Sequence, residues 1–361
     1  MDSLITPAAV VDLDRMEANL DRMAAYSAQH RIALRPHTKT HKAPNIAAEQ
    51  IRRGAAGLTV ATLREAAVMA PLGVDLLLAH PPVGAPKLRR LIEIAGTAKL
   101  TVALDSAEAL EGLGAAVRGS GVEISVLIEI DAGMHRVGVQ TPDHATSLVR
   151  RVQELHGLRY RGILFYPGHI RENVSEQDAA IDSLNTTLAE FLDALNAAGL
   201  SPEIVSGGST PAAFASHRVQ GLTEMRPGTY VYNDRTTALV DACRWEDCAY
   251  SVLATVVSTS VSGQAVVDAG SKSIFREELR GSTATGLGAL LDRPDVILKG
   301  MSEEHGLLDL SNTDWRPRVG DRVRIVPNHV CVSVNLQPFI YGVRGDSIET
   351  RWDVAARGWS D

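Results

Sequence analysis

Short apolar runs alternate with longer amphipathic stretches through about the first 230 residues of the chain. The apolar runs predict strands over residues 8–12, 33–38, 57–62, 75–80, 100–105, 124–131, 160–166 and 203–206. The amphipathic stretches predict helices over residues 15–30, 43–53, 63–72, 85–95, 106–118, 142–155 and 175–198. Because the strands are continuously apolar, we expect a parallel sheet whose outer face is covered by the helices.

Eight successive strands separated by helices match the closed (β/α)8 barrel, which keeps its active-site residues at the C-terminal ends of its strands. A doubly wound open sheet is the alternative, but no G-x-G-x-x-G motif follows the first predicted strand. The predicted fold class is therefore α/β, with an N-terminal (β/α)8 TIM-type barrel and a C-terminal β-rich domain.

The pattern changes after Asp234, where helical periodicity largely disappears. Strands are predicted over residues 250–260, 264–269, 321–327 and 339–344, separated by turns rich in Gly, Ser and Asp. We expect residues 8–234 to form the barrel. Residues 235–361, together with residues 1–7, are expected to form the β-rich domain.

The composition indicates a soluble protein of the cytoplasm. No run reaches the roughly 18 to 20 apolar residues of a membrane span, and no basic stripe with interleaved aromatics indicates nucleic-acid binding. The net charge is a modest -7. Met1–Pro7 does not resemble a signal peptide, and three cysteines (Cys243, Cys248 and Cys331) are too few for a disulfide framework. We therefore expect neither a membrane nor a nucleic-acid partner.

A cluster of cations, Arg35, His37 and Lys39, ends the second predicted strand in the sequence R-P-H-T-K-T-H-K. On a strand these three side chains would share one face and reach the mouth of the barrel. Ordinary surface charge at a strand end is the alternative. A lysine beside other cations loses its proton more readily, and a neutral amine can attack an aldehyde. The cluster therefore predicts that Lys39 is a reactive amine.

Two donor-rich loops follow the last predicted strands. One, S-G-G-S-T-P, begins at Ser206, and the other, M-R-P-G-T-Y, begins at Met225. Glycines let backbone N–H groups approach an anion, and hydroxyls add donors. Such turns are common in any protein, but the last two βα loops of a barrel frequently bind phosphate. Together the loops predict a phosphorylated ligand.

Arg136, in the sequence D-A-G-M-H-R-V-G, follows another predicted strand and should point into the same mouth. A fixed planar cation there suits an anionic or phenolic oxygen. A salt bridge that closes the rim of the barrel is the alternative.

His329 and Cys331 lie two residues apart in the sequence P-N-H-V-C of the β-rich region. On a strand they would point to one side and could chelate one ion. Imidazole and thiolate are zinc-type donors, but two ligands leave the rest of the shell to water, substrate or a more distant residue. A buried structural cysteine is the alternative.

These motifs together resemble one family, the D-threonine aldolase and eukaryotic-type D-serine dehydratase group, which shares its fold with alanine racemase. The resemblance runs from Thr6 to Gly358, and R-P-H-x-K-x-H-K is quite specific to this group. It implies pyridoxal 5'-phosphate held by Lys39 as a Schiff base. It also implies a divalent metal on His329 and Cys331, zinc first, with manganese or magnesium as alternatives. A homodimer is expected by the same likeness.

The resemblance also assigns roles to further positions. Arg136 would lie near the phenolic oxygen of the cofactor, Arg226 would face the pyridine nitrogen and Tyr166 would lie against the ring. The phosphate would be bound by Gly207, Gly208, Ser209, Gly228 and Tyr230, with Thr62 as a further neighbour. The sequence S-E-E-H-G, from Ser302, is also similar to the family and either lines the site or is surface charge.

By the same likeness, the expected function is that of a lyase acting on D-3-hydroxy amino acids. P-N-H-x-C resembles the zinc pair of D-serine dehydratases, whereas D-threonine aldolases of the best-known type have Asp at the position of Cys331. We therefore expect β-elimination of water, giving a 2-oxo acid and ammonia. Retro-aldol cleavage to glycine and an aldehyde is the alternative. An amino-acid racemase and a non-catalytic cofactor carrier are further alternatives, although the region that carries Cys331 argues against a carrier.

Overall fold

The structure of the chain is a computed structural model that describes residues 1–279 and 284–358. The chain divides into two compact units. The β unit comprises Met1–Arg22, Thr40–Ala43 and Thr229–Gly358, and the barrel unit comprises Met23–Lys39 and Pro44–Gly228. Residues 280–283 and 359–361, which belong to the expected β-rich domain, lie outside the described residues.

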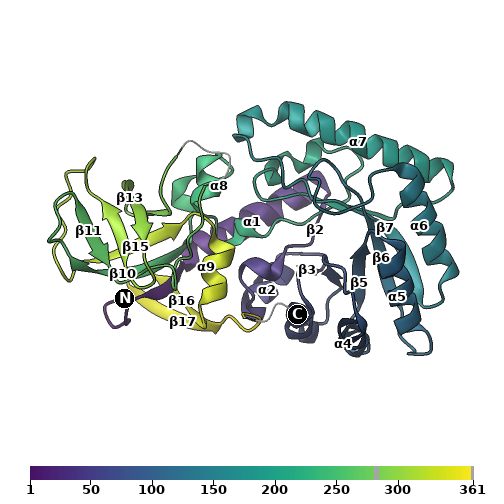
Figure 1. Cartoon of the computed structure of the whole chain (residues 1–361), viewed down its shortest axis with the longest axis horizontal. Coiled ribbons are helices and arrows are strands. Elements are labelled where there is room, and N and C mark those ends of the chain that lie inside the picture. Colours follow the sequence, from purple (N-terminus) through teal and green to yellow (C-terminus); the bar gives the residue numbers. More distant parts are fainter. Residues whose placement is uncertain (280–283, 359–361) are drawn as a thin grey trace. The chain divides into compact units, whose positions relative to one another are not determined.

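The barrel unit contains an eight-stranded parallel sheet (Figure 1). Its strands are β2 (Ala33–Leu34), β3 (Leu58–Val60), β4 (Leu76–Leu78), β5 (Leu100–Leu104), β6 (Ile124–Glu129), β7 (Leu158–Leu164), β8 (Ile204–Gly207) and β9 (Glu224–Met225), in the order β2-β9-β8-β7-β6-β5-β4-β3. A parallel bridge between His37 and Thr59 joins the two end strands, so the sheet closes. The predicted α/β barrel fold is confirmed.

Helices follow the strands and cover the outside of the sheet. They are α2 (Pro44–Arg52), α3 (Leu63–Met69), α4 (Ala85–Ala95), α5 (Ala107–Val117), α6 (Pro142–Glu154) and α7 (Asp178–Ala197), with the 3-10 helices η2 (Ala70–Leu72), η3 (Val174–Glu176) and η4 (Ala213–Arg218). Their apolar faces pack with the outward side chains of the strands in one large core cluster. N-caps fix several helix starts: the Ser106 hydroxyl accepts from Ala109 N and the Thr141 hydroxyl from His144 N. The predicted helices are confirmed to within a few residues.

The inside of the barrel has its own apolar layer. Leu77, Ala103, Leu127, Leu164 and Ile204 come from five consecutive strands and form a separate buried cluster. Every second residue of a strand shares its face, so the polar residues that end these strands lie above this layer. The strand ends are therefore where side chains can meet a ligand.

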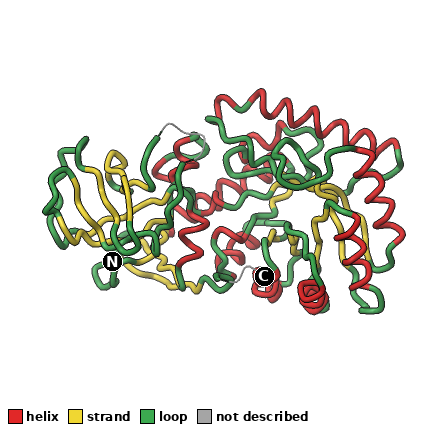
Figure 2. The backbone as a smooth tube through the Cα atoms, viewed as in Figure 1, coloured by secondary structure: helices red, strands yellow, loops and turns green. Residues whose placement is uncertain are grey.

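The β unit is built from strands with little helix, as Figure 2 shows. Its strands are β1 (Ala8–Asp12), β10 (Tyr250–Ser258), β11 (Gln264–Val267), β12 (Gly288–Leu290), β13 (Arg293–Met301), β14 (Gly306–Asp309), β15 (Arg322–Pro327), β16 (Phe339–Arg344) and β17 (Ser347–Asp353). Strands β10 to β15 close into an antiparallel barrel because β11 pairs with both β14 and β10. The unit also holds α8 (Arg235–Leu239), α9 (Val330–Leu336), η5 (Thr229–Val231) and η6 (Trp245–Asp247). Helix α1 (Leu13–His30) contributes residues to both units.

The first predicted strand does not belong to the parallel barrel. Strand β1 pairs with β10 and β16 in the nine-stranded sheet, so its assignment as the first barrel strand is wrong. The eighth barrel strand is instead β9, whose two residues are too few to produce a pattern. The run Ala8–Val11 is buried on both faces. A central strand of either sheet would have the same continuously apolar sequence, so the sequence does not distinguish the two sheets. Within the described residues, no helix is long and apolar enough to cross a membrane.

Candidate active site

Lys39 lies on a turn and not on a strand. Strand β2 ends before Arg35, and Lys39 sits in the 3-10 helix η1 (Thr38–Thr40). The prediction that Arg35, His37 and Lys39 share one face of a strand is therefore wrong. Pro36 has no N–H for a strand ladder, and the chain turns shortly after it. Lys39 is nevertheless carried at the C-terminal end of a barrel strand, where such barrels place their chemistry.

Tyr166, just after β7, has two cations of the barrel unit near its ring. Nζ of Lys39 is 6.0 Å from the centroid of the Tyr166 ring, and Cζ of Arg136 is 4.9 Å from it. Gly168 makes room for the ring, because a Cβ at that position would overlap the Tyr166 side chain. The structure therefore brings together three residues that the sequence places on three separate strand ends.

The loop that carries Arg136 is fixed by Asp131. Oδ1 of Asp131 accepts hydrogen bonds from the backbone N–H groups of Gly133 (3.1 Å) and His135 (2.9 Å), and Oδ2 lies 2.8 Å from Nδ1 of His135. Burial raises the pKa of Asp131, but these hydrogen bonds outweigh burial and leave the pKa below its ordinary value. The carboxylate thus stays ionised and holds the turn that precedes Arg136.

Arg226 is buried and fully oriented by the barrel interior. Its Nη1 donates to the Ser206 hydroxyl and its Nη2 to the backbone oxygen of Phe165, both at 2.8 Å. The Ser206 hydroxyl donates to Glu224 (2.6 Å), which also accepts from Nε of Arg35 (2.7 Å). Burial lowers the pKa of Arg226 to about 10. The guanidinium is therefore held in place by the protein alone.

Glu129 is a buried carboxyl that the sequence does not single out. It ends β6, two residues after the interior side chain of Leu127, and is 4% exposed. Burial raises its pKa to about 7, and the charges of Arg226 and Arg136 oppose that rise only in part. Glu129 is therefore close to half-protonated at neutral pH, in electrostatic reach of the two arginines.

We expect Glu129→Gln to stabilise the cofactor-free protein at high pH. A carboxyl whose pKa is raised by folding favours the folded state below its unfolded pKa of about 4.5, and this contribution is lost as pH rises through about 7. The shift corresponds to roughly 3 kcal/mol. Urea unfolding midpoints at pH 5 and pH 8 check this. The stability of the variant relative to the parent protein should increase from pH 5 to pH 8. Exposed Glu123→Gln is the control, and an equal pH dependence in parent and Glu129→Gln would contradict the expectation.

The glycine loop after β8 leaves a buried hydroxyl available. A Cβ at Gly207 would overlap the Phe165 ring, and Gly208 has a φ of +96°, which favours glycine. The hydroxyl of Ser209 is buried and has no hydrogen-bond partner in the described part of the chain. A buried donor without a partner is costly, so this loop fits an anionic group that would accept from Ser209.

The other residues predicted to bind the phosphate lie in different settings. Gly228 follows β9 in the barrel unit, whereas Tyr230 belongs to the β unit, where it is buried in η5. The hydroxyl of Thr62 accepts from the backbone N–H of Glu65 and caps α3. Thr62 therefore already has a structural role in the barrel.

His329 and Cys331 lie at the start of a helix. Strand β15 ends at Pro327, His329 is the N-cap of α9, and Cys331 is in its first turn. The prediction that the pair lies on a strand is wrong, but the two side chains still lie close enough for the charge of Cys331 to raise the pKa of His329. A cap residue and the first turn of its helix can aim two side chains at one point as well as a strand can.

Asp234 orients His329 within the β unit. Nδ1 of His329 lies 3.0 Å from Oδ2 of Asp234, and the same oxygen accepts from Val330 N at 3.1 Å. The charge of Cys331 is the largest cause that raises the pKa of His329 above its ordinary value, with the Asp234 carboxylate adding to it. A carboxylate on one ring nitrogen of a histidine is the usual partner of a metal ligand and leaves Nε2 for the ion.

The pair forms an open site. No group of three or more His, Cys, Asp and Glu side chains is arranged around a common point within residues 1–279 and 284–358. Nitrogen and sulfur ligands suit zinc, and two protein ligands leave positions for water or substrate. The donor set therefore fits a reactive metal better than a structural one.

Two threonine hydroxyls lie against the sulfur of Cys331. Oγ1 of Thr40 is 3.2 Å from Sγ, and Oγ1 of Thr229 is 4.0 Å from it. In the sequence, Thr40 directly follows Lys39 and Thr229 directly follows Gly228. Each hydroxyl can donate to a thiolate, and hydrogen bonds to ligand atoms tune metal affinity.

Sequence reasoning missed Asp234, Glu129 and Thr40. Asp234 lies 95 positions before His329, and only the fold brings them together. Glu129 lies inside the predicted strand of residues 124–131, and nothing in that run marks its side chain as interior. Thr40 is inside the R-P-H-T-K-T-H-K motif, so that motif was the one available signal.

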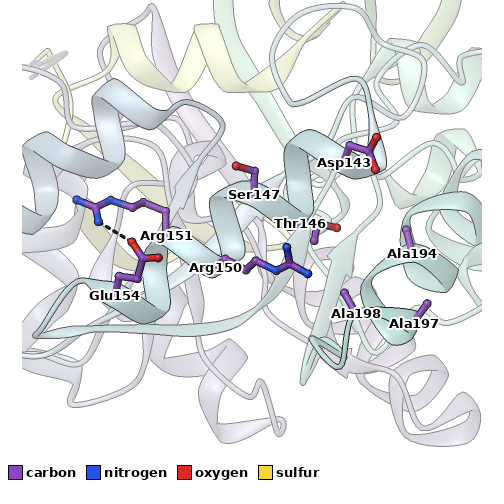
Figure 3. Close-up of a pocket in the computed structure, with 9 residues that line it drawn as sticks. All are labelled: Asp143, Thr146, Ser147, Arg150, Arg151, Glu154, Ala194, Ala197 and Ala198. Carbon is purple, nitrogen blue, oxygen red and sulfur yellow. Dashed lines mark hydrogen bonds and ion pairs between the residues drawn. The ribbon is translucent and has the colours of Figure 1, made fainter.

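A surface groove between α6 and α7 is a different feature. Its lining residues are Asp143, Thr146, Ser147, Arg150, Arg151, Glu154, Ala194, Ala197 and Ala198 (Figure 3). None of the residues predicted for cofactor or metal binding lines it, and its arginines and alanines lie on the outward faces of two helices. The groove is therefore not the candidate active site.

Two family models match this chain, one after the other along the sequence. Residues 11–236 match the alanine racemase N-terminal domain, and residues 249–343 match the putative serine dehydratase domain. The chain is 34% identical to D-threo-3-hydroxyaspartate dehydratase of Delftia sp. (strain HT23) over 99% of this chain and 98% of that protein. It is 30% identical to D-threonine aldolase of Arthrobacter sp over 98% and 93%.

Solved structures of proteins named for the same two activities superpose on this chain. D-threonine aldolase from Filomicrobium marinum superposes with a TM-score of 0.90 at 34% identity, covering 98% of this chain and 96% of that one. D-threo-3-hydroxyaspartate dehydratase from Delftia sp. HT23 superposes with a TM-score of 0.88 at 33% identity, covering 99% of each chain. That enzyme is also known as a histidine-to-alanine variant and, in a metal-free form, as a cysteine-to-alanine variant; the two positions are two residues apart.

Proposed function

This chain belongs to the family of pyridoxal-phosphate-dependent lyases that includes D-threonine aldolase and D-serine dehydratase, and on that premise we propose that it dehydrates D-3-hydroxy amino acids. The products would be a 2-oxo acid and ammonia. The observation that carries the proposal is the pairing of His329 with Cys331, backed by Asp234. The matched relatives include enzymes named for dehydration of such a substrate, among them the Delftia protein.

We assign the cofactor to the strand ends of the barrel unit. Bound pyridoxal phosphate would supply an electron sink for negative charge at Cα of the substrate. Lys39 would hold the cofactor through Nζ and would take the Cα proton. Arg136 would face the phenolic oxygen, Tyr166 would pack against the ring and Arg226 would face the ring nitrogen. The hydroxyl of Ser209 and the N–H groups of the glycine loop would receive the phosphate, which suits a buried Ser209 hydroxyl that has no partner among the described residues.

We assign a divalent metal, zinc first, to Nε2 of His329 and Sγ of Cys331. A bound cation would act as a Lewis acid on the β-hydroxyl and help it leave. Asp234 keeps the imidazole oriented, and Oγ1 of Thr40 lies 3.2 Å from the sulfur, where it could donate to a thiolate. In solved structures of D-threo-3-hydroxyaspartate dehydratase, a histidine and a cysteine with this same spacing have been replaced by alanine, and the structure of the cysteine variant is in a metal-free form. That spacing supports the assignment of the pair.

Aldol cleavage is the second candidate, because D-threonine aldolases are as similar to this chain as dehydratases are. Cys331 favours dehydration, since the best-known D-threonine aldolases have Asp at this position. The two reactions differ in which bond at Cα or Cβ breaks, and the products separate them.

A product assay tests the proposal. Purified holoenzyme is given D-serine, D-threonine and D-threo-3-hydroxyaspartate, with and without a chelator. Release of 2-oxo acid and ammonia that stops with the chelator and returns with zinc is the expected result. Glycine and an aldehyde would identify an aldolase instead. Loss of chirality that does not depend on metal would identify a racemase.

We expect Thr40→Val to weaken zinc binding by about tenfold. Valine keeps the shape of threonine but removes the hydroxyl that lies 3.2 Å from Sγ of Cys331. Competition with a chromophoric chelator, using cofactor-free protein, measures the affinity. Thr40→Ser retains the hydroxyl and should bind zinc as the parent protein does. Equal affinity in the valine variant would show that the hydroxyl does not support the thiolate.

A further inference from the structure

The proposed site leaves two of the three thiols unused. Cys243 is partly exposed and Cys248 is buried, and both are free. They lie at the two ends of the segment C-R-W-E-D-C in the β unit, and the side chain of Cys243 is one of the causes that raise the pKa of Cys248. One thiol can influence the other in this way only as a close neighbour across this short loop, and neighbouring free thiols can be oxidised to a disulfide.

Both sulfur atoms also contact one capping box. The hydroxyl of Thr237 and the carboxylate of Asp234 form the N-terminal capping box of α8. Sγ of Cys243 donates to Oγ1 of Thr237 at 3.6 Å, and Sγ of Cys248 donates to the backbone oxygen of Asp234 at 3.6 Å. Oγ1 of Thr237 lies 2.9 Å from that same oxygen. The two sulfurs therefore contact neighbouring oxygen atoms of one capping box.

Asp234 links these thiol contacts to the proposed metal pair. One of its carboxylate oxygens accepts from Thr237 N (2.9 Å), and the other lies 3.0 Å from Nδ1 of His329. Asp234 is fully buried, so it has no solvent-exposed alternative position. A displacement of its backbone must therefore be transmitted to the imidazole.

We propose that Cys243 and Cys248 are an oxidation site, closed to a disulfide by hydrogen peroxide, and that closure weakens metal binding at His329. The partly exposed Cys243 sulfur attacks the peroxide O–O bond, becomes a sulfenic acid and releases one water. The Cys248 sulfur then attacks the sulfenic sulfur, forms the S–S bond and releases a second water. Two thiols are oxidised by two electrons, and one peroxide is reduced to two waters.

The order of the two steps follows from burial. The interaction with Cys243 and burial raise the pKa of Cys248 well above its ordinary value, so Cys248 remains a thiol while the partly exposed Cys243 meets the oxidant. Closing the bond brings the sulfurs to about 2.05 Å. Both S–H donors to the capping box are lost at the same time, so Asp234 loses the contact that Cys248 makes with its backbone.

The second half of the inference rests on the proposed metal site, because it predicts a change in metal affinity. Residues that hydrogen-bond to metal ligands typically raise metal affinity by tenfold to a hundredfold. We therefore expect zinc to bind about tenfold more weakly to the oxidised protein. Coupling between two sites is reciprocal, so bound zinc should also slow disulfide formation.

The full-length protein is treated with hydrogen peroxide, with and without zinc, alkylated and digested with trypsin. Arg244 lies between the two cysteines, so cleavage there separates Cys243 and Cys248 into two peptides unless a disulfide joins them. Cys331 falls on a third peptide, so its oxidation is scored separately. Zinc affinity of reduced and oxidised protein is measured with a chromophoric chelator. Cys243→Ser, which keeps a hydroxyl toward Thr237, is the control variant.

The expected result is a linked peptide pair in the parent protein, none in Cys243→Ser, and weaker zinc binding only where the pair is linked. Absence of the linked pair while peroxide oxidises Cys331 would overturn the oxidation site. A linked pair with unchanged zinc affinity would overturn the coupling to His329. Reduced protein that binds no zinc would instead refute the proposed metal pair, and the linked peptide would still decide the disulfide.

Discussion

Lys39→Ala should lose catalytic turnover by at least about a thousandfold and lose the visible absorbance of the bound cofactor. The variant removes the amine that is proposed both to hold the cofactor and to take the Cα proton. These two roles rest on one nitrogen, 6.0 Å from the centroid of the Tyr166 ring. Absorbance spectra after gel filtration and initial rates of 2-oxo acid release measure the two losses separately.

Two variants sharpen the Lys39 experiment. Lys39→Arg keeps the positive charge but cannot act as a primary amine, so it should fail as Lys39→Ala does. Lys99→Ala removes an exposed lysine just before β5, at the opposite end of the barrel strands, and should keep both absorbance and rate. Retained absorbance together with full activity in Lys39→Ala would refute the central assignment.

Strands and helices of the barrel could be predicted because each is marked by its own residues. A continuous apolar run such as Leu100–Leu104 is buried along its whole length, and the helix of Ala85–Ala95 shows its buried face through its periodicity. Local pattern sets local structure in these elements. It does not identify the sheet that a strand joins, which is why Ala8–Asp12 was assigned to the wrong one.

The β unit was predicted less completely for a related reason. Strands β13 and β17 carry charged and exposed residues along much of their length, so their sequences resemble loops. They are strands because neighbouring strands pair with them in the sheet. Backbone pairing leaves little trace in side-chain composition, particularly in strands with a solvent-facing side.

The site was predictable to the extent that its motifs are local. Lys39, Arg136 and Tyr166 each follow a recognisable strand, and a closed barrel brings its strand ends together. The partners of His329 and Cys331 are different, because Asp234 and Thr40 are distant in sequence and are brought to them by the fold. Contacts of this kind depend on where side chains lie in the folded protein, and no pattern along the sequence indicates those positions.

Asp234 and Thr40 contact the two proposed metal ligands, and the second large effect is expected on metal binding. His329→Ala should reduce zinc binding and dehydration by at least about a hundredfold while leaving the cofactor absorbance in place. The imidazole is one of the two proposed protein ligands, and its loss would leave a single thiolate for the ion. Zinc content after dialysis, cofactor absorbance and product release give three separate measurements. Loss of the cofactor along with the metal would point to a misfolded variant and not to a missing ligand.

Asp234→Asn isolates the charge behind His329. Asparagine is also a good N-cap, so the start of α8 should survive, while the carboxylate that now lies 3.0 Å from Nδ1 of His329 is lost. Zinc affinity should then be about tenfold to a hundredfold lower than in the parent protein. It should remain higher than in His329→Ala. Unfolding midpoints close to the parent value would exclude a general loss of stability. If Asp234→Asn bound zinc as tightly as the parent, the carboxylate would serve only to cap α8, and the case for His329 as a metal ligand would lose its strongest structural support.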